Sequence, residues 1–342
     1  MTTTPFQAVM HRRATPMEKY LSAILVAYVA IVTIKNPLFF SPETLFDMVR
    51  SGAGTMLLAI GVLVVLISGG IDVSFTAVAI VSGYLSVLVV LRLGIDSVLL
   101  ALLLSAVIGV LLGAVNAVLI HFLRLPTLIV TLATMSVYHG LMAVIVGTKS
   151  YPAAEMPASL VQFGTGDLVV VDSGTGRYGL TVFLPIVVAA LVLTWFVLYR
   201  TMLGRAVFAI GSDEESASRL GINILLTKLF VYAYMGALAG VMGIVYFANL
   251  KYVNPTSLIG EELMIIAAVV IGGAKLTGGE GTVLGTVLGV AVVQLFDTTL
   301  VFLGLSSSWN DLFFGAVLLL SLSVMYRRQR LADRRNLVFT AS

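Results

Sequence analysis

The charged residues of this chain lie almost entirely in the gaps between long apolar runs. Hydrophobic residues make up 59% of the 342 positions and charged residues only 11%, whereas a soluble protein carries roughly 25% charged residues. An apolar run of about 20 residues can cross a bilayer as a helix. Because the runs are continuous rather than alternating, and because backbone in lipid must bond to itself, the sequence predicts an all-α integral membrane protein.

About ten transmembrane helices are expected in one polytopic domain, 20–326, between an N-terminal segment, 1–19, and a basic tail, 327–342. The eighth segment is short for a full crossing, so it is read either as a span or as a broken or re-entrant helix. The segments are expected at residues 20–40, 51–68, 75–91, 97–120, 127–147, 180–199, 228–249, 263–274, 282–303 and 311–326.

The distribution of basic residues predicts the orientation. With the N-terminus inside, 14 of the 20 Lys and Arg face the cytoplasm and 6 face the other side. Cytoplasmic loops carry such an excess, so both termini are expected in the cytoplasm. The loop at 148–179 then lies outside, where it is expected to form a surface cap, and the polar loop at 200–227 lies inside.

The inner loop contains the signals of a short, well-capped helix. Ser212 and Glu215 have the spacing of a capping box, Arg219 matches the helix dipole, and Gly221 supplies a left-handed stop. The helix has about two turns, too few to be stable alone in water. Ala217 and Leu220 are expected to form a small apolar contact stripe. The capping signals fit two interpretations equally well: an ordinary connector between two spans, or a docking site for another protein.

Four stretches of the chain resemble the permease subunits of ABC importers, in particular those of the ribose and simple-sugar group. Together they cover nearly the whole chain from 20 to 326, and no single one is decisive. Two departures from the family pattern are Asp213-Glu214 and Phe75-Thr76. The four stretches are Ser68-Gly-Gly-Ile-Asp-Val-Ser74, Leu125-Pro-Thr-Leu-Ile-Val-Thr-Leu-Ala-Thr-Met135, Gly204 to Ile222, and Ile271-Gly-Gly-Ala-Lys-Leu-Thr-Gly-Gly-Glu-Gly-Thr282.

The resemblance implies a permease in the bacterial inner membrane that is not itself an enzyme. ATP and Mg would be bound by a separate cytoplasmic ABC ATPase, and this subunit would bind no cofactor. The other implied partners are a periplasmic sugar-binding protein, a second permease copy or paralogue, and membrane lipid, with no nucleic acid. The chain agrees in having no Gly-x-x-x-x-Gly-Lys-Ser/Thr phosphate loop. The ATPase-coupling residues implied by the resemblance are Gly204, Arg205, Gly211, Ser212, Glu215, Ala217, Leu220 and Gly221.

Two glycine pairs interrupt apolar segments in the two halves of the chain. Gly69-Gly70 is followed by Asp72 and Ser74, and Gly272-Gly273 stands in a similar context in the second half. Interrupted segments at corresponding places in two halves are the best sequence pointer to a transport pathway, and broken backbone offers hydrogen-bonding groups to a sugar. Two tight turns, with Asp72 only capping the third span, are an equally good reading.

Polar side chains inside the apolar runs supply the remaining pathway candidates. Such groups at membrane depth are rare and usually functional, although Thr often bonds to its own helix and Asn often holds helices together. His139 is one of these polar positions but is not selected. The selected residues are Asn116, Thr131, Gln294 and Asp297.

Two other functions remain as alternatives. An ion-coupled secondary transporter would need a buried carboxylate, for which Asp72 and Asp297 are the candidates. A membrane enzyme is disfavoured, because the chain has no His-Glu-x-x-His and no Gly-x-Ser-x-Gly motif. There is no cysteine, and three scattered histidines do not predict a metal site.

Overall fold

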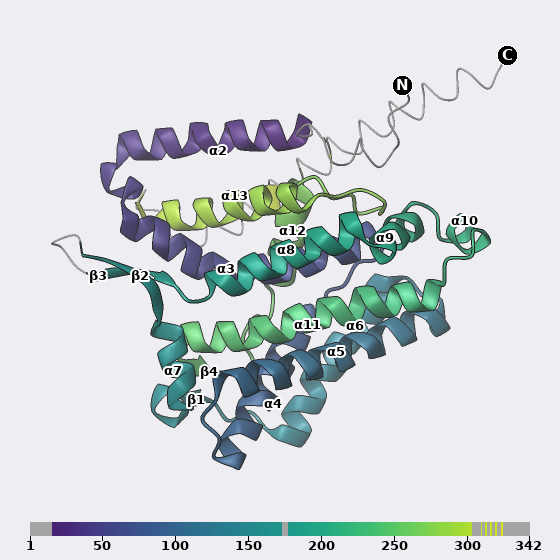
Figure 1. The fold of residues 1–342 in the computed structure, drawn as a ribbon, viewed down its shortest axis with the longest axis horizontal. Helices are drawn as coiled ribbons and strands as arrows, with labels where there is room; N and C mark the ends of the chain where they lie inside the picture. The colour runs from purple at the N-terminus through teal and green to yellow at the C-terminus, as the bar shows by residue number, and fades with distance from the viewer. Residues whose placement is uncertain are drawn as a thin grey trace.

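A computed structural model describes residues 16–172 and 177–302, together with single positions between 309 and 323. The predicted tenth segment, 311–326, lies outside the described residues apart from those single positions, and so do the tail 327–342 and most of the segment 1–19. The described chain is almost entirely helical (Figure 1). Its long helices are α2 (Pro16–Lys35), α3 (Pro42–Ile67), α4 (Phe75–Leu93), α5 (Val98–Leu123), α6 (Thr127–Leu141), α8 (Leu184–Arg200), α11 (Ile224–Leu250) and α13 (Val283–Phe302).

These helices confirm the prediction of an all-α membrane protein. In the described residues, seven helices are long and apolar enough to cross a bilayer, or eight if α8 and α9 (Met202–Ser212), which are bent by 74°, count as one span. Each of the first nine predicted segments contains a helix, but the count of ten is approximate. The eighth, α12 (Glu262–Ile271), has ten residues, and a length of about 15 Å is half of a hydrocarbon core of about 30 Å.

Several helices begin earlier than the hydrophobic pattern indicates, because local caps set their ends. α3 begins at Pro42, nine residues before the predicted span, since the Ser41 hydroxyl accepts a hydrogen bond from the Thr44 amide at 3.2 Å. Proline at the first helical position favours this start. α2 ends at Lys35 and is followed by a short 3₁₀ turn, η1 (Pro37–Phe40). The predicted first span, 20–40, is therefore one helix plus this turn.

The core is centred on α11, which packs against α3 on one side and against α4 and α5 on the other (Figure 1). Glycines allow α5 and α11 to approach at backbone distance. A Cβ added to Gly236 would lie 2.0 Å from the Gly109 carbonyl oxygen, and one added to Gly240 would lie 2.2 Å from the Ser105 carbonyl oxygen. The Ser105 hydroxyl also donates to the Gly240 carbonyl at 2.7 Å. Small residues permit this packing where lipid offers no hydrophobic driving force.

The molecule has two distinct ends, which we call the strand end and the α10 end. The strand end carries α7 (Ala158–Thr165) and two antiparallel strand pairs: β1 (Tyr151–Pro152) with β4 (Tyr252–Val253), and β2 (Asp167–Asp172) with β3 (Arg177–Thr181). The α10 end carries α9 and α10 (Glu214–Arg219) at the right of Figure 1. The segment expected as a surface cap, 148–179, thus contains α7 and most of these strands.

Replacing Gly236 by Ala should destabilise the protein, because its added Cβ would collide with the Gly109 carbonyl. Overpacking of this kind costs about 1–3 kcal/mol. The measurement is the midpoint of thermal unfolding in detergent. The matched control is Gly140→Ala on α6, where an added Cβ meets no heavy atom within 4 Å. Equal midpoints for the two variants would contradict the close packing of α5 on α11.

Candidate functional site

The break between α3 and α4 comprises seven residues, 68–74, that belong to neither helix. Gly69 has a φ of +82°, a conformation that glycine adopts without strain. The freed backbone is satisfied from α6: the Thr127 hydroxyl accepts from the Ile71 amide at 2.8 Å, and the Thr131 hydroxyl accepts from the Val73 amide at 3.3 Å. Thr131 also donates to the Ile71 carbonyl at 3.2 Å. This exchange allows non-helical backbone to persist inside the protein.

A chain of polar side chains starts in this break and continues into α5 and α6. Asp72 is 4% exposed, and its Oδ1 accepts from the amide and the hydroxyl of Ser74, both at 2.7 Å. Asn116 donates its Nδ2–H to the Ser74 hydroxyl at 2.7 Å, and the Tyr138 hydroxyl donates to the Asn116 Oδ1 at 3.0 Å. We call Asp72, Ser74, Asn116, Thr131 and Tyr138 the Asp72 cluster.

The Asp72 cluster brings together four of the predicted pathway residues. In the described part of the chain, no ion pair reaches Asp72, so hydrogen bonds alone offset the cost of burying its carboxylate. The Tyr232 hydroxyl of α11 is also buried here, beside Gly70, where an added Cβ would come within 2.4 Å of it.

Gln294 and Asp297 are not part of this cluster. Both lie on α13, where Gln294 donates to the Ser51 hydroxyl of α3 at 2.8 Å and Asp297 is exposed. The sequence placed them correctly within an apolar helix, but it gave no signal of the face on which they lie. Their assignment to the substrate pathway stays a prediction.

The second glycine pair forms a structural turn away from the Asp72 cluster. Gly273 has a φ of +97°, and a Cβ added to Gly272 would lie 2.4 Å from the Gly285 carbonyl oxygen of α13. The first turn of α2 also contacts this region, since the Thr282 hydroxyl donates to the Glu18 carboxylate at 2.7 Å.

The two breaks meet each other at the end of α9. The Gly279 amide donates to the Ile67 carbonyl at 2.9 Å, so the end of α3 is bonded to the turn between α12 and α13. Gly211 of α9 lies against this contact, because a Cβ there would come within 1.8 Å of the Ile67 carbonyl oxygen. A Cβ on Gly278 would meet the Gly69 Cα at 2.6 Å. We call Gly69, Gly211, Gly278 and Gly279 the glycine junction.

The capping box predicted for Ser212 and Glu215 is wrong, because Asp213 is the N-cap of α10 and the Glu215 carboxylate bonds to Arg219. Ser212 is the last residue of α9 and donates its hydroxyl to the Phe208 carbonyl at 2.9 Å. Asp213 is the cap: its Oδ1 accepts from the Glu215 and Ser216 amides at 3.0 and 3.2 Å. A carboxylate accepts more hydrogen bonds than a hydroxyl, and Asp213 also accepts from the Ser216 hydroxyl.

Other parts of the α10 prediction are confirmed. Gly221 has a φ of +83°, and its amide and that of Ile222 bond back to Ser218 and Ala217, which is a Schellman ending. Glu215 makes an ion pair with Arg219 at 2.6 Å. The expected apolar stripe is wrong, however, because Ala217 is 2% exposed and Leu220 is 81% exposed. The helix ends between them, so the two side chains face different surroundings.

At the start of the coupling segment, Gly204 makes the bend between α8 and α9 possible, since a Cβ there would lie 2.3 Å from the Leu198 carbonyl oxygen. Arg205 is exposed on α9. An ion pair between Lys228 and Glu214 at 2.8 Å fastens α10 to the start of α11. α10 is therefore held by short contacts at both of its ends.

Glu262 and Thr76 were not among the predicted pathway residues, and His139 was named as a polar position but not selected. Glu262 is 7% exposed and accepts from the Thr76 hydroxyl at 2.5 Å. The available signal was the short eighth segment: where a membrane helix is too short to cross, the residue at its start lies below the surface. Tyr138 and Tyr232 were missed because aromatic residues at helical spacing are typical of an ordinary core.

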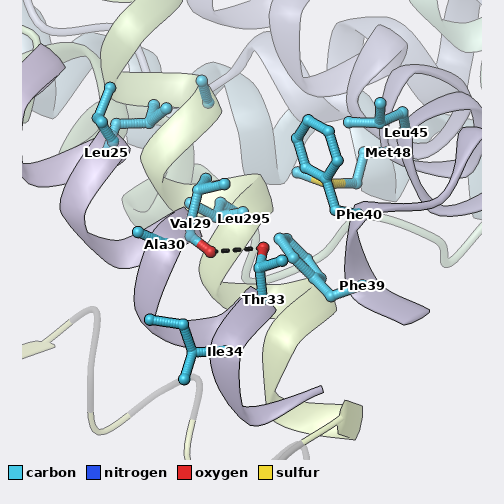
Figure 2. A pocket seen from close by; sticks show the side chains of 12 residues that line it. Leu25, Val29, Ala30, Thr33, Ile34, Phe39, Phe40, Leu45, Met48 and Leu295 are labelled. Atoms are coloured by element: carbon cyan, nitrogen blue, oxygen red, sulfur yellow. Dashed lines mark hydrogen bonds between the residues drawn. The ribbon is translucent and has the colours of Figure 1, made fainter. Parts of the chain in front are cut away.

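An apolar groove of about 690 Å³ lies between α2, η1, α3 and α13. Figure 2 shows that Thr33 is the polar side chain among those that line it, and its hydroxyl donates to the Val29 carbonyl at 2.7 Å. The groove thus offers no polar group to a hydrophilic solute. Among the described residues, no group of three or more His, Asp or Glu side chains could hold a metal ion.

Replacing Asp213 by Ala should loosen α10, since the loss of a helix cap costs about 0.5–2 kcal/mol. The measurement is hydrogen exchange of the amides in 214–221, which should accelerate, whereas Ser212→Ala should leave them unchanged. Hydrogen bonds from the Ser216 hydroxyl and amide hold the pKa of Asp213 below its usual value of 3.8. The contribution of the ionised cap is therefore full above that value and is lost as the pH falls through the lowered pKa. Faster exchange in Ser212→Ala would contradict this assignment of the cap.

Comparison with known proteins identifies the family. The model of the family described as branched-chain amino acid transport system / permease component matches residues 44–322. The ribose import permease protein RbsC of Escherichia coli strain K12 is 32% identical over 317 residues, which cover 91% of this chain and 94% of that protein. RbsC of Bacillus subtilis is 33% identical over 87% of this chain and 89% of that protein. The autoinducer 2 import system permease protein LsrC of Yersinia enterocolitica is 33% identical over 93% of this chain and 84% of that protein.

No solved structure matches the chain. The family match covers the breaks, the Asp72 cluster and the coupling segment, and the relatives are matched over most of their own length. The resemblance to permease subunits is thereby confirmed. The chain belongs to the family of membrane permease components of transport systems, and it is a multi-pass membrane protein.

Proposed function

We propose that this chain is the permease subunit of an ATP-driven ABC importer for a monosaccharide or a related small polyhydroxylated solute. The observation that carries the proposal is the Asp72 cluster, a buried set of hydroxyl, amide and carboxylate groups at a break between two membrane helices. The names of the relatives support it, because they import ribose or autoinducer 2.

The chemistry of the cluster suits a neutral, hydroxyl-rich solute. The residues Thr127, Thr131, Thr134 and Tyr138 recur at helical spacing on the face of α6 that adjoins the break. Hydroxyl and amide groups can both donate and accept hydrogen bonds, so they can exchange bonds with one another for bonds with a sugar. A site of this kind rejects solutes that leave its buried polar groups unpaired.

The coupling segment, 204–222, is proposed to dock on a separate ATPase subunit that binds ATP and Mg. α10 offers a capped helix with Leu220 fully outward, an apolar side chain that a partner can bury. Movement of α10 would reach the pathway through the glycine junction, which holds the end of α9 against both breaks. Alternating access would then arise from shifts of the two breaks against each other.

The orientation follows from this assignment. The α10 end would face the cytoplasm with both termini, in agreement with the excess of basic residues predicted for that side. The strand end would face the periplasm of a bacterial inner membrane, where a sugar-binding protein would deliver the solute. A second permease copy or a paralogue would complete the channel, and lipid would cover the remaining apolar surface.

An ion-coupled secondary transporter is the second candidate, and one observation favours it. Asp72 is a buried carboxylate without an ion-pair partner in the described chain, and such groups serve in proton relays. Asp297, the other residue predicted for this role, is exposed on α13 and does not join Asp72.

The source of energy separates the two candidates. Vesicles that contain the permease, its ATPase and its binding protein should accumulate radiolabelled D-ribose or another monosaccharide when ATP is present on the ATPase side. The permease alone should accumulate none under an imposed proton gradient. Uptake by the permease alone, driven by the gradient, would instead establish the secondary transporter.

Replacing Leu220 by Asp should lower ATP-driven uptake about tenfold or more, because a charge at the centre of an apolar contact is a hot-spot change. The ATPase should also co-purify less with the permease. The matched control is Leu220→Met, which conserves volume and should keep uptake within about twofold. Unchanged uptake and unchanged co-purification in Leu220→Asp would remove α10 from the docking surface.

A further inference from the structure

Glu262 is a buried carboxylate at the start of a helix that is too short to cross a membrane. It is the first residue of α12, whose ten residues end at the turn beside the glycine junction. A ten-residue helix rises about 15 Å, so Glu262 lies about half a bilayer thickness from that turn. The chain reaches it from β4 at the strand end through a non-helical segment, 254–261. A buried carboxylate at this depth is costly unless it has partners.

The partners of Glu262 leave part of its hydrogen-bonding capacity unused. Its Oε1 accepts from the Thr76 hydroxyl at 2.5 Å and its Oε2 accepts from the Gly260 amide at 3.0 Å. An ionised carboxylate offers about four acceptor positions, and the structure fills two of them. Thr76 is 1% exposed, so its hydroxyl has no access to solvent and depends on Glu262.

His139 of α6 supplies an unpaired polar atom on the same side of the break. Its Nε2 is buried and has no hydrogen-bond partner among the described residues, and the imidazole interacts electrostatically with Glu262. A buried polar atom without a partner calls for an explanation. A solute with several hydroxyl groups would satisfy both side chains, because one hydroxyl can donate to the carboxylate while another bonds to the imidazole.

This group is separate from the Asp72 cluster. His139 follows Thr131 by eight residues, which is about 12 Å along α6, in the direction of the strand end. Thr76 of α4 follows Asp72 of the break in the same direction. His139 is turned about 80° around α6 from Thr131, so it lies farther toward the strand end and on a different face from the polar residues that adjoin the Asp72 cluster.

We propose that Glu262, Thr76 and His139 form a second hydroxyl-binding site for the transported solute, on the strand-end side of the Asp72 cluster. The inference rests on the proposed function and names a recognition site within it. A solute hydroxyl that bonds to Glu262 competes with the Thr76 hydroxyl. Since that bond joins α4 to α12, one helix from each break, occupancy of the site weakens the link between the two halves of the protein.

The absence of cysteine from the natural chain makes a direct test available. The complex of permease, ATPase and binding protein is reconstituted with a single Thr76→Cys substitution, and its labelling by a small methanethiosulfonate reagent is followed during ATP turnover. The probe is D-ribose, or whichever pentose or hexose the wild-type complex accumulates. The matched control is Ser82→Cys, a buried hydroxyl on the same helix that bonds only to backbone carbonyls.

The expected result is that millimolar sugar slows labelling at Thr76→Cys at least fivefold and leaves Ser82→Cys unchanged. Labelling at Thr76→Cys that is independent of sugar would overturn the second site, and so would the absence of any labelling during turnover, because a solute could then not reach this position from water. ATP-driven uptake by the wild-type complex would in both cases still uphold the proposed function. If the wild-type complex accumulates no sugar with ATP, the proposed function itself fails, and the second site fails with it.

Substitution of the carboxylate provides a second measurement. Glu262→Gln should lower ATP-driven uptake at least tenfold and leave the ATPase activity of the assembled complex within about twofold, since hydrogen bonds to a charged group are stronger than those to a neutral amide. The control is Glu261→Gln, the exposed neighbouring carboxylate, which should keep normal uptake. Equal uptake by the two variants, or a joint loss of uptake and complex assembly in Glu262→Gln, would assign Glu262 a purely structural role.

Discussion

The demand that buried backbone finds hydrogen bonds within the protein decides the form of this molecule. A helix satisfies that demand by itself, so each departure from helical structure inside the apolar core needs a side chain to replace the lost bond. Thr127 and Thr131 do this for residues 71–73 at the break after α3. Because these threonines stand on one face of α6, the repair of the break also creates a polar surface. The polar site and the break are therefore two consequences of the same constraint.

The glycine junction follows from a related constraint on space. The end of α3, the end of α9 and the turn after α12 approach at backbone distance, which glycine at positions 69, 211 and 278 permits. The single hydrogen bond from the Gly279 amide to the Ile67 carbonyl fixes one break to the other. At this contact backbone touches backbone directly, so there are no side chains between the segments that could rearrange when one of them moves. A movement of α9 must therefore pass to both breaks together, which makes this contact a suitable link between a docking segment and a pathway.

Much of this arrangement was predictable, and the remainder has clear physical reasons. Apolar runs predict the helices, because they show which segments lie in lipid or in the protein core. Glycine pairs predict the breaks, because glycine tolerates non-helical backbone conformations. The Ser212 cap was predicted wrongly because Asp213, the next residue, accepts from the Glu215 and Ser216 amides through its Oδ1 and from the Ser216 hydroxyl through its Oδ2. Asp297 and Glu262 show the limit more sharply. Each is an acid beside or within an apolar helix, but only the packing of neighbouring helices decides that Asp297 faces outward and Glu262 faces Thr76.

The two buried carboxylates play different parts in this structure. The Asp72 Oδ1 bonds to Ser74, two residues away, and the bonds of Ser74 continue to Asn116 and Tyr138. Asp72 thus holds the shape of its own break. Glu262 instead bonds across the molecule to Thr76. A group whose bonds are local is suited to maintain a conformation, and a group whose bond joins two segments is suited to respond to a ligand. Asp72 is therefore suited to position the hydroxyl and amide groups of its cluster, whereas Glu262, in the proposed second site, would respond directly to the solute.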